Sequence, residues 1–203
     1  EIPAIEQDDR RCRSDCAHMN VTPLNLVIHG KRMLTAEICE LDLQDPSGQT
    51  LPPFDAGAHI NVATPSGAIR SYSISNDPVE THRYVIAVKR EDKGRGGSLS
   101  MVNATRVSQP ISVSAPSNAF ALVDAPQYLL VAGGIGITPI LSMMRVLARR
   151  RDARFRLVYC TRSPGVTPFL PELSVPEFAG RITVHHDEGH PEHAFDFWPS
   201  FAK

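Results

Sequence analysis

The spacing of apolar residues changes once along this chain, close to Pro126, and this change limits the folds open to it. Before Pro126, short apolar runs of strand length alternate with turn segments such as DPSGQ, PSG and NDP. After it, the apolar run YLLVAGG is followed by GITP, by the basic amphipathic stretch SMMRVLARRR and by a second strand-like run, FRLVYC. A strand, a helix and another strand in this order begin an α/β unit with a parallel sheet. The sequence therefore predicts an all-β unit followed by an α/β unit.

The first unit contains six strand-like runs, which are LNLVIHG, AEICELDL, AHINVAT, IRSYSIS, RYVIAVKR and ISVSAPS. In RYVIAVKR, Tyr84, Ile86 and Val88 alternate with residues of the opposite face, as in a strand with one face toward a core. We therefore predict a six-stranded antiparallel β-barrel, with GRGGSLSMVNAT forming a glycine-rich turn that opens a short helix. In the second unit, RITVHHDEG predicts a third strand and Phe195–Phe201 a short helix.

Length and composition agree with two units. The 203 residues, of which 42% are hydrophobic and 21% charged, leave room for two domains of about 100 residues, each with its own core. We place a polar tail at residues 1–20, the barrel domain at 21–124 and a truncated Rossmann-like α/β domain at 125–203. The net charge of −1 gives no overall attraction for nucleic acid, and no apolar run reaches the roughly 20 residues of a membrane-spanning helix. No secretory signal is evident, so a cytoplasmic protein is predicted.

Potential metal ligands occur in two places, and neither is predicted to bind a metal. The tail carries Cys12, Cys16 and His18, which form an incomplete set. The second group gathers at the end of a predicted strand and in the polar loop after it, as His185, His186, Asp187, Glu188, His190 and His193. The sequence has no C-x4-C-x2-C run, so no plant-type [2Fe–2S] cluster is expected in this chain.

Two motifs of the first unit suit a phosphate and a flat ring system. In the segment RSYS (residues 70–73), the guanidinium can grip a phosphate through paired donors, the tyrosine ring can lie against an apolar ring, and a hydroxyl can donate to the ring edge. In GRGGS (residues 94–98), the glycines let backbone amides converge on an anion, and Ser98 opens a helix whose dipole favours negative charge. The alternative is that these segments bind no ligand and are an exposed strand and a flexible loop. Neither motif alone distinguishes a flavin site from this alternative.

A third motif, LVAGGIGITP (residues 130–139), is a strand followed by a glycine turn and a helix start. It is not a G-x-G-x-x-G fingerprint, but its glycines permit close backbone approach to a pyrophosphate, Pro139 suits the first helical turn and Thr138 can cap it. The segment CTRS (residues 160–163) follows the next strand, at the edge where α/β sheets bind ligands. Arg162 and Ser163 there are suited to a ribose, and an ordinary surface loop is the alternative.

Together, RSYSISNDP, RYVIAVKR and GRGGS resemble the flavin-binding barrel of the ferredoxin-reductase superfamily, and the chain is most similar to the phthalate dioxygenase reductase family. The resemblance implies FMN as cofactor, with FAD less favoured, and NADH as co-substrate. It implies that the arginine and the glycine loop hold the flavin phosphate, while the glycine turn lines the nicotinamide site. Ser73 and Thr138 are carried over as catalytic residues. The cofactor-binding residues carried over are Arg70, Ser71, Tyr72, Ser73, Ala87, Val88, Lys89, Gly96, Gly97, Ser98, Gly133, Gly134, Gly136, Thr138, Pro139, Thr161, Arg162 and Ser163.

The resemblance implies an NADH-dependent flavoprotein reductase that passes electrons through FMN to a separate iron–sulfur protein or oxygenase component of an aromatic-ring dioxygenase or O-demethylase system. It covers residues 24–203, and the Cys-Gly-Pro segment and the [2Fe–2S] domain of that family do not occur in this sequence. We therefore expect either a fragment or a reductase with a separate electron acceptor. Two alternatives stay open: an FAD-containing ferredoxin or flavohaemoglobin-type reductase, and a non-catalytic flavin-binding fragment.

Overall fold

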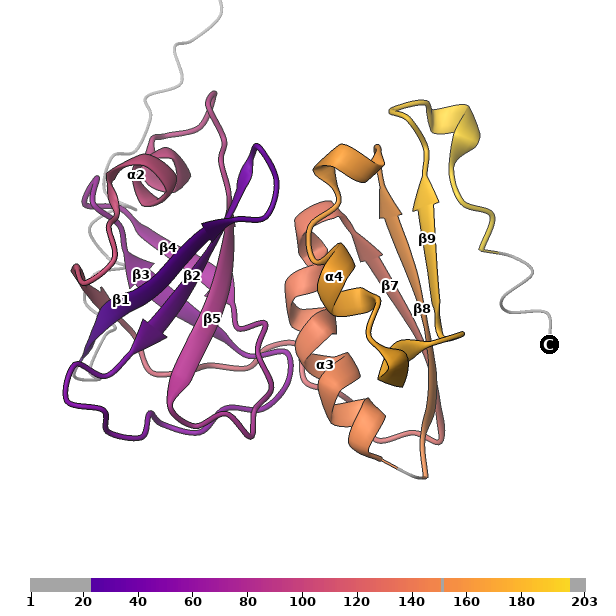
Figure 1. Ribbon diagram of the computed structural model, residues 1–203, viewed down its shortest axis with the longest axis horizontal. Helices are drawn as coiled ribbons and strands as arrows, with labels where there is room; N and C mark the ends of the chain where they lie inside the picture. Colours follow the sequence, from indigo (N-terminus) through magenta and orange to yellow (C-terminus); the bar gives the residue numbers. More distant parts are fainter. Residues whose placement is uncertain (1–22, 151, 198–203) are drawn as a thin grey trace, which may run out of the picture.

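The computed structural model describes residues 23–150 and 152–197, and its strands form two separate sheets that lie side by side (Figure 1). The predicted tail, with Cys12, Cys16 and His18, lies outside the described residues. Among the described helices, none combines the length and the apolar character that a bilayer crossing requires.

The first sheet contains the six predicted antiparallel strands. They are β1 (Leu24–Met33), β2 (Ile38–Gln44), β3 (His59–Ala63), β4 (Ile69–Ser73), β5 (Arg83–Lys89) and β6 (Pro110–Val113). Their order is β4-β3-β6-β1-β2-β5, and an isolated bridge between Ile74 and Ile86 joins the two ends of this order. The sheet therefore closes into a barrel, which protects strand edges from pairing with other chains.

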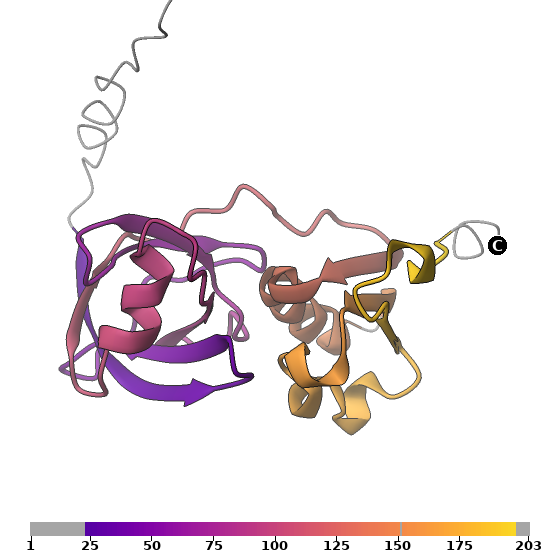
Figure 2. The same ribbon diagram turned by 90° about the horizontal axis from the view of Figure 1, so that it is seen from above.

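Alternation of side chains along the strands builds the core of this barrel. In β5, Tyr84, Ile86 and Val88 are almost completely buried, as the sequence pattern predicts. Helix α2 (Gly97–Ala104) lies across one end of the barrel (Figure 2), and its Met101 joins the same apolar cluster. Burial of one such side chain contributes about 1.5–3 kcal/mol, so the barrel carries its own stabilising core.

The second sheet contains three parallel strands, β7 (Gln127–Gly133), β8 (Arg154–Thr161) and β9 (Ile182–His186), in the order β7-β8-β9. Helix α3 (Ile137–Arg149) connects β7 to β8, so the predicted strand–helix–strand unit is confirmed. The shorter helical segments are η2 (Gly134–Gly136), η3 (Pro164–Val166), α4 (Leu170–Leu173), η4 (Pro176–Phe178) and η5 (Pro191–His193). Because the strands are parallel, their carboxyl ends meet at one edge of the sheet.

The helix predicted for Phe195–Phe201 is wrong for the part that the structure describes. Residues Phe195 to Phe197 are not helical. The Phe195 ring instead packs edge-on against His185 and against Phe197. The segment is therefore extended along the end of β9 in aromatic contact with it, and not coiled as a helix.

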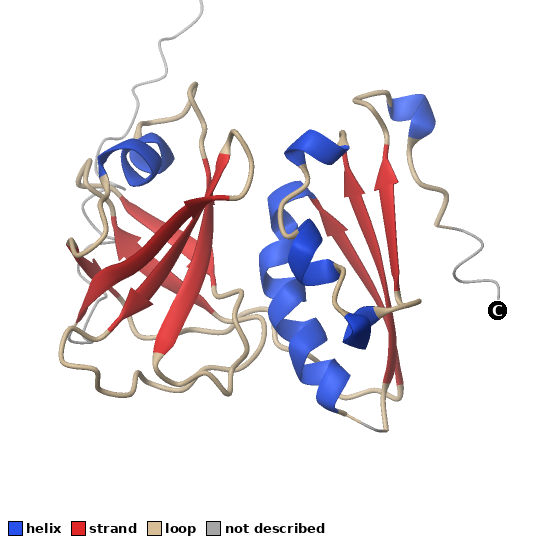
Figure 3. Cartoon of the chain, in the orientation of Figure 1, coloured by secondary structure: helices blue, strands red, loops and turns tan. Residues whose placement is uncertain are grey.

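Helices α3 and α4 lie between the barrel and the parallel sheet (Figures 1 and 3). One apolar cluster crosses this boundary: Ile38, Ala56 and Ala87 of the barrel pack with Met143 and Met144 of α3. An ion pair between Arg32 and Glu172 connects β1 with α4. The two sheets are therefore joined by packing as well as by the chain between them, and the predicted domain boundaries stay predictions.

Candidate functional site

Strand β4 places Arg70 directly against the glycine loop before α2. A Cβ atom built on Gly97 would lie only 3.0 Å from Arg70 Nε and 3.2 Å from Arg70 Cγ. The Arg70 side chain therefore fills the space that a larger residue at position 97 would need. Its Nη1 donates a hydrogen bond to the Ile69 carbonyl at 2.8 Å, which holds the guanidinium over the start of α2 while part of it stays exposed.

The start of α2 offers further donors for an anion beside Arg70. Gly96, with φ of 82°, adopts the left-handed conformation that glycine tolerates, and no side chain of the described residues caps the helix that begins at Gly97. The first backbone amides of a helix lack intrahelical partners, and the helix dipole adds partial positive charge there. Ser98 lies inside the helix, and its hydroxyl accepts a hydrogen bond from the Glu91 amide at 3.1 Å, which closes the glycine loop.

Lys31 supports the opposite end of α2, a role that sequence reasoning missed. Its Nζ donates hydrogen bonds to the carbonyls of Val102 at 2.6 Å and of Thr105 at 2.8 Å. A cation at the carboxyl end of a helix complements the helix dipole and satisfies terminal carbonyls. Since 71 residues separate Lys31 from Val102, no local sequence pattern could have revealed this contact.

Tyr72 presents a hydrogen-bonding group that is buried without a partner. Its hydroxyl oxygen is inaccessible and has no hydrogen bond within the described residues, while its ring packs against the barrel cluster. Burial raises the pKa of this hydroxyl, with the nearby charge of Arg70 opposing the shift. Buried polar groups in native proteins are nearly always hydrogen-bonded. An orphaned hydroxyl beside an exposed guanidinium is therefore a place where a bound ligand would restore a missing partner.

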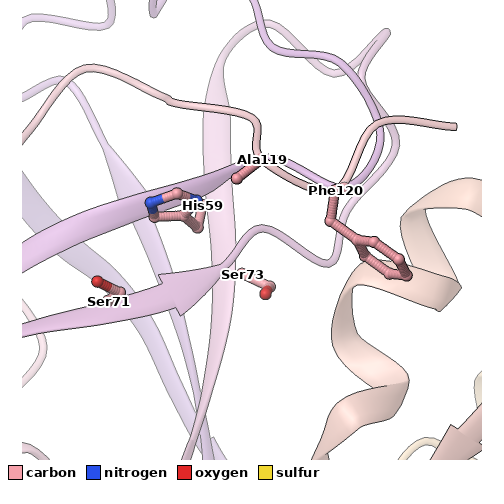
Figure 4. A pocket seen from close by; sticks show the side chains of 6 residues that line it. His59, Ser71, Ser73, Ala119 and Phe120 are labelled. Atoms are coloured by element: carbon pink, nitrogen blue, oxygen red, sulfur yellow. The ribbon is translucent and has the colours of Figure 1, made fainter.

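Ser71 and Ser73 lie on the other face of β4, in an open pocket of about 240 Å³ (Figure 4). The pocket is lined by Gly57, His59, Ser71, Ser73, Ala119 and Phe120. His59 stands directly opposite Ser73 in the pairing of β3 with β4. The ring of Phe120 extends from the pocket toward α3 (Figure 4), and Phe120 and Met143 both line a second pocket.

The pocket exists because the segment after β6 is held across the barrel. The backbones of His59 and Ser117 exchange two hydrogen bonds, at 2.8 and 2.9 Å. Gly57, with φ of +96°, allows the Phe120 carbonyl to approach so closely that a Cβ atom would lie 1.9 Å from its oxygen. Sequence reasoning missed both residues: the pairing of β3 with β4 brings His59 beside Ser73, and the long-range crossing of the barrel brings Phe120 there.

The predicted residues of β5 differ in what they expose. Val88 is fully buried in the barrel, so only its backbone could reach a ligand. Ala87 packs in the apolar cluster shared with α3, and Lys89 is exposed and paired with Glu91 at 3.2 Å. Of these three residues, Ala87 is the one whose side chain lies in the cluster that joins the two sheets.

The glycine turn after β7 faces open space. Within the part of the chain that the structure describes, Cβ atoms built on Gly133, Gly134 and Gly136 would meet nothing within 4 Å, which leaves room for a ligand to approach this backbone. Pro139 lies in the first turn of α3, as predicted. The predicted capping role of Thr138 is wrong: it lies inside the helix, and its hydroxyl donates to the Ile135 carbonyl at 3.1 Å instead of accepting from an amide.

The segment after β8 combines one structural residue with two accessible ones. The buried Thr161 hydroxyl is hydrogen-bonded to Thr167 Oγ1 at 2.6 Å and to His186 Nδ1 at 2.9 Å, which leaves it little freedom to contact a ligand. Arg162 is exposed and Ser163 half-buried, beside the glycine turn at the carboxyl edge of the sheet.

Two histidines at the end of β9 form hydrogen bonds with other residues of the chain. His185 Nε2 is hydrogen-bonded to the His193 carbonyl at 2.6 Å, and His186 contacts Thr161. Across residues 23–150 and 152–197, no three or more histidine, cysteine, aspartate or glutamate side chains are grouped to hold a metal ion.

No protein-family model matches the chain. Individual known proteins, in contrast, are similar to it over most of its length. It is 50% identical over 179 residues to the phthalate 4,5-dioxygenase oxygenase reductase subunit of Pseudomonas putida, covering 88% of this chain and 55% of the relative. It is 48% identical over 181 residues to the phthalate dioxygenase reductase of Burkholderia cepacia, covering 89% of this chain and 56% of the relative. The chain is a homologue of the phthalate dioxygenase reductases.

A solved phthalate dioxygenase reductase has the same fold. It matches with a TM-score of 0.87 and 48% identity over 89% of this chain and 57% of that structure, which is described as modular for electron transfer from pyridine nucleotides to [2Fe–2S]. The predicted barrel and α/β architecture is thus the fold of the phthalate dioxygenase reductases. The chain spans about half the length of the curated relatives that it matches.

Proposed function

We propose that this chain binds FMN, takes electrons from NADH and passes them to a separate iron–sulfur protein or oxygenase component of an aromatic-ring dioxygenase or O-demethylase system. The observation that carries the proposal is the placement of Arg70 over Gly97 at the uncapped start of α2. The relatives, which are named as reductases of phthalate dioxygenase systems, support the same function.

The residues present fit a flavin monophosphate. Arg70 and the first amides of α2 supply charged and neutral donors for one phosphate, and such charge-assisted contacts are the strong ones. On the same strand, the Tyr72 hydroxyl has no hydrogen-bond partner within the described residues and could donate to the cofactor, and Ser73 faces an open pocket. A bound flavin would supply the ability to accept two electrons at once and to release them singly. In this proposal, the protein binds the cofactor, orients it and excludes water from one side.

The glycine edge of the parallel sheet is the proposed NADH site. The backbone is open to a dinucleotide at Gly133, Gly134 and Gly136. The side chains of Arg162 and Ser163 are accessible at the same edge and could bind its ribose. We propose Ser73 and Thr138 as the residues nearest the reacting rings. Since Thr138 is only 6% exposed, its contribution would come through the helix start that it stabilises.

The test is to load the purified chain with FMN or with FAD and to follow its absorbance during anaerobic mixing with NADH. We expect the chain to retain FMN. We also expect NADH to bleach the flavin absorbance at about 450 nm. Retention of FAD in preference to FMN would favour the ferredoxin or flavohaemoglobin-type alternative. Retention of FMN without bleaching by NADH would favour the non-catalytic alternative.

Replacing Tyr72 with phenylalanine tests the orphaned hydroxyl. Because the hydroxyl has no partner within the described residues, we expect the unfolding free energy of the flavin-free protein to stay the same or to rise by up to about 1 kcal/mol. If FMN supplies the missing partner, its dissociation constant should increase by about two- to tenfold. Chemical denaturation and fluorescence titration measure the two effects.

Tyr84 offers a matched control. Its hydroxyl already donates to the Pro52 carbonyl at 2.5 Å, so Tyr84→Phe should destabilise the flavin-free protein by about 1 kcal/mol and leave FMN affinity unchanged. If the two variants behaved alike, Tyr72 would have no special relation to the cofactor.

A further inference from the structure

Two arginines of α3 contact the turn that follows β4. Arg145 Nη1 donates a hydrogen bond to the Ser75 carbonyl at 2.9 Å, and Arg149 forms an ion pair with Asp77. The arginines are four residues apart, so they project from the same face of α3 one turn from each other. Because Ser75 and Asp77 belong to the barrel, this face is turned toward the barrel, beside which α3 lies in Figure 1.

The turn that they contact is itself rigidly attached to the barrel. The Ser75 amide and hydroxyl both donate to the Val85 carbonyl, at 2.8 and 3.1 Å. The fully buried Asn76 accepts from the Val85 amide at 2.9 Å and donates to the Arg83 carbonyl at 3.2 Å. The turn that contains Ser75 and Asp77 therefore keeps a fixed position relative to β5 and to the rest of the barrel.

The turn after β4 and helix α3 each adjoin one part of the proposed site, the flavin part and the nucleotide part. The turn begins two residues after Ser73, and α3 begins at the glycine turn beside Thr138. At 1.5 Å per residue, the 13 residues of α3 form a rod of about 20 Å. The orientation of this rod on the barrel therefore decides where the glycine turn stands relative to β4.

Apolar packing alone would define this orientation poorly. The apolar cluster that joins α3 to the barrel contains Met143 and Met144 of α3 together with Ile38, Ala56 and Ala87 of the barrel. Hydrophobic attraction is non-directional, and methionine side chains adapt easily to a shifted neighbour. Charged hydrogen bonds have defined geometry, so the two arginines, like the Arg32–Glu172 pair between β1 and α4, can select one orientation.

We propose that Arg145 and Arg149 are positioning residues, which lock α3 onto the turn after β4 and so align the glycine turn with the proposed flavin site. The inference rests on the proposed function for its catalytic meaning. Its structural part, that these contacts hold the two sheets in one orientation, can be measured without any activity.

The experiment compares the full chain, loaded with FMN, with its Arg145→Gln/Arg149→Gln double variant. Small-angle X-ray scattering should show a larger radius of gyration for the variant, because the two sheets then sample several orientations. At saturating NADH, the limiting rate of flavin reduction should fall at least about tenfold, since misplacement of reacting groups by about 1 Å costs up to roughly a hundredfold. The dissociation constant of FMN should stay within about twofold of the wild-type value, because neither arginine touches the Arg70 cradle.

Two further variants separate positioning from loss of charge. Arg145→Lys/Arg149→Lys should recover much of the rate, since a lysine can still donate to the Ser75 carbonyl and pair with Asp77. Arg156→Gln, on the exposed side of β8, removes a positive charge away from this contact and should match the wild type in every measurement.

A double variant with unchanged scattering and an unchanged limiting rate would overturn the inference. Loss of FMN in proportion to the loss of rate would overturn it as well, because the arginines would then stabilise the barrel and not its alignment. If NADH fails to reduce even the wild type, the proposed function fails, and the scattering comparison alone upholds or overturns the locking role.

Discussion

Replacing Arg70 with alanine is expected to raise the dissociation constant of FMN by roughly tenfold to a hundredfold. A hydrogen bond to a charged group contributes about 1.5–3 kcal/mol, and each 1.4 kcal/mol corresponds to a factor of about ten. Arg70 has this effect because it lies over the start of α2, where its positive charge and the helix amides act on the same anion. Fluorescence titration of the flavin-free protein measures the change.

Two companion variants sharpen this prediction. Gly97→Ala keeps the charge but places a Cβ atom about 3.0 Å from Arg70 Nε, so it should displace the guanidinium and weaken FMN binding as well. Arg156→Ala, which removes an exposed arginine on β8, should leave FMN affinity unchanged. Equal affinity in Arg70→Ala and the wild type would remove the central support of the proposed function.

Replacing Gly57 with alanine should destabilise the protein by about 2–6 kcal/mol. The left-handed backbone at φ of +96° costs a non-glycine residue of order 1–3 kcal/mol. In addition, the new Cβ would lie 1.9 Å from the Phe120 carbonyl oxygen, so the segment that crosses the barrel must move. Overpacking of this kind adds roughly 1–3 kcal/mol. Urea denaturation monitored by circular dichroism gives the free energy of unfolding.

Gly67 provides the matched control for Gly57. It also has a positive φ, of +83°, but a Cβ atom there would meet no atom of residues 23–150 or 152–197 within 4 Å. Gly67→Ala should therefore show the backbone cost alone, and the difference between the two variants isolates the contact with Phe120. Equal destabilisation would mean that the segment after β6 does not press on Gly57 in solution.

The elements of the fold were predictable because each leaves a local periodic pattern. The alternation of Tyr84, Ile86 and Val88 predicted a strand with a buried face, and the change of pattern near Pro126 predicted the parallel sheet. Details at helix starts were less predictable. Thr138 has the right residue type for a cap, but the preceding glycine turn winds into a 3-10 segment, so the helix starts before Thr138 reaches a capping position.

The amino-acid sequence by itself determined the strands, the order of the two units and the residue types able to bind a phosphate, since these depend on side-chain periodicity and on chemistry within a few positions. Only the tertiary structure decided which of these groups act together. Arg70 meets Gly97, Lys31 caps α2, Phe120 closes over Gly57 and Arg145 reaches Ser75, all between segments far apart in the chain. Such contacts follow from barrel closure and from the packing of α3 on the barrel, which no local pattern encodes.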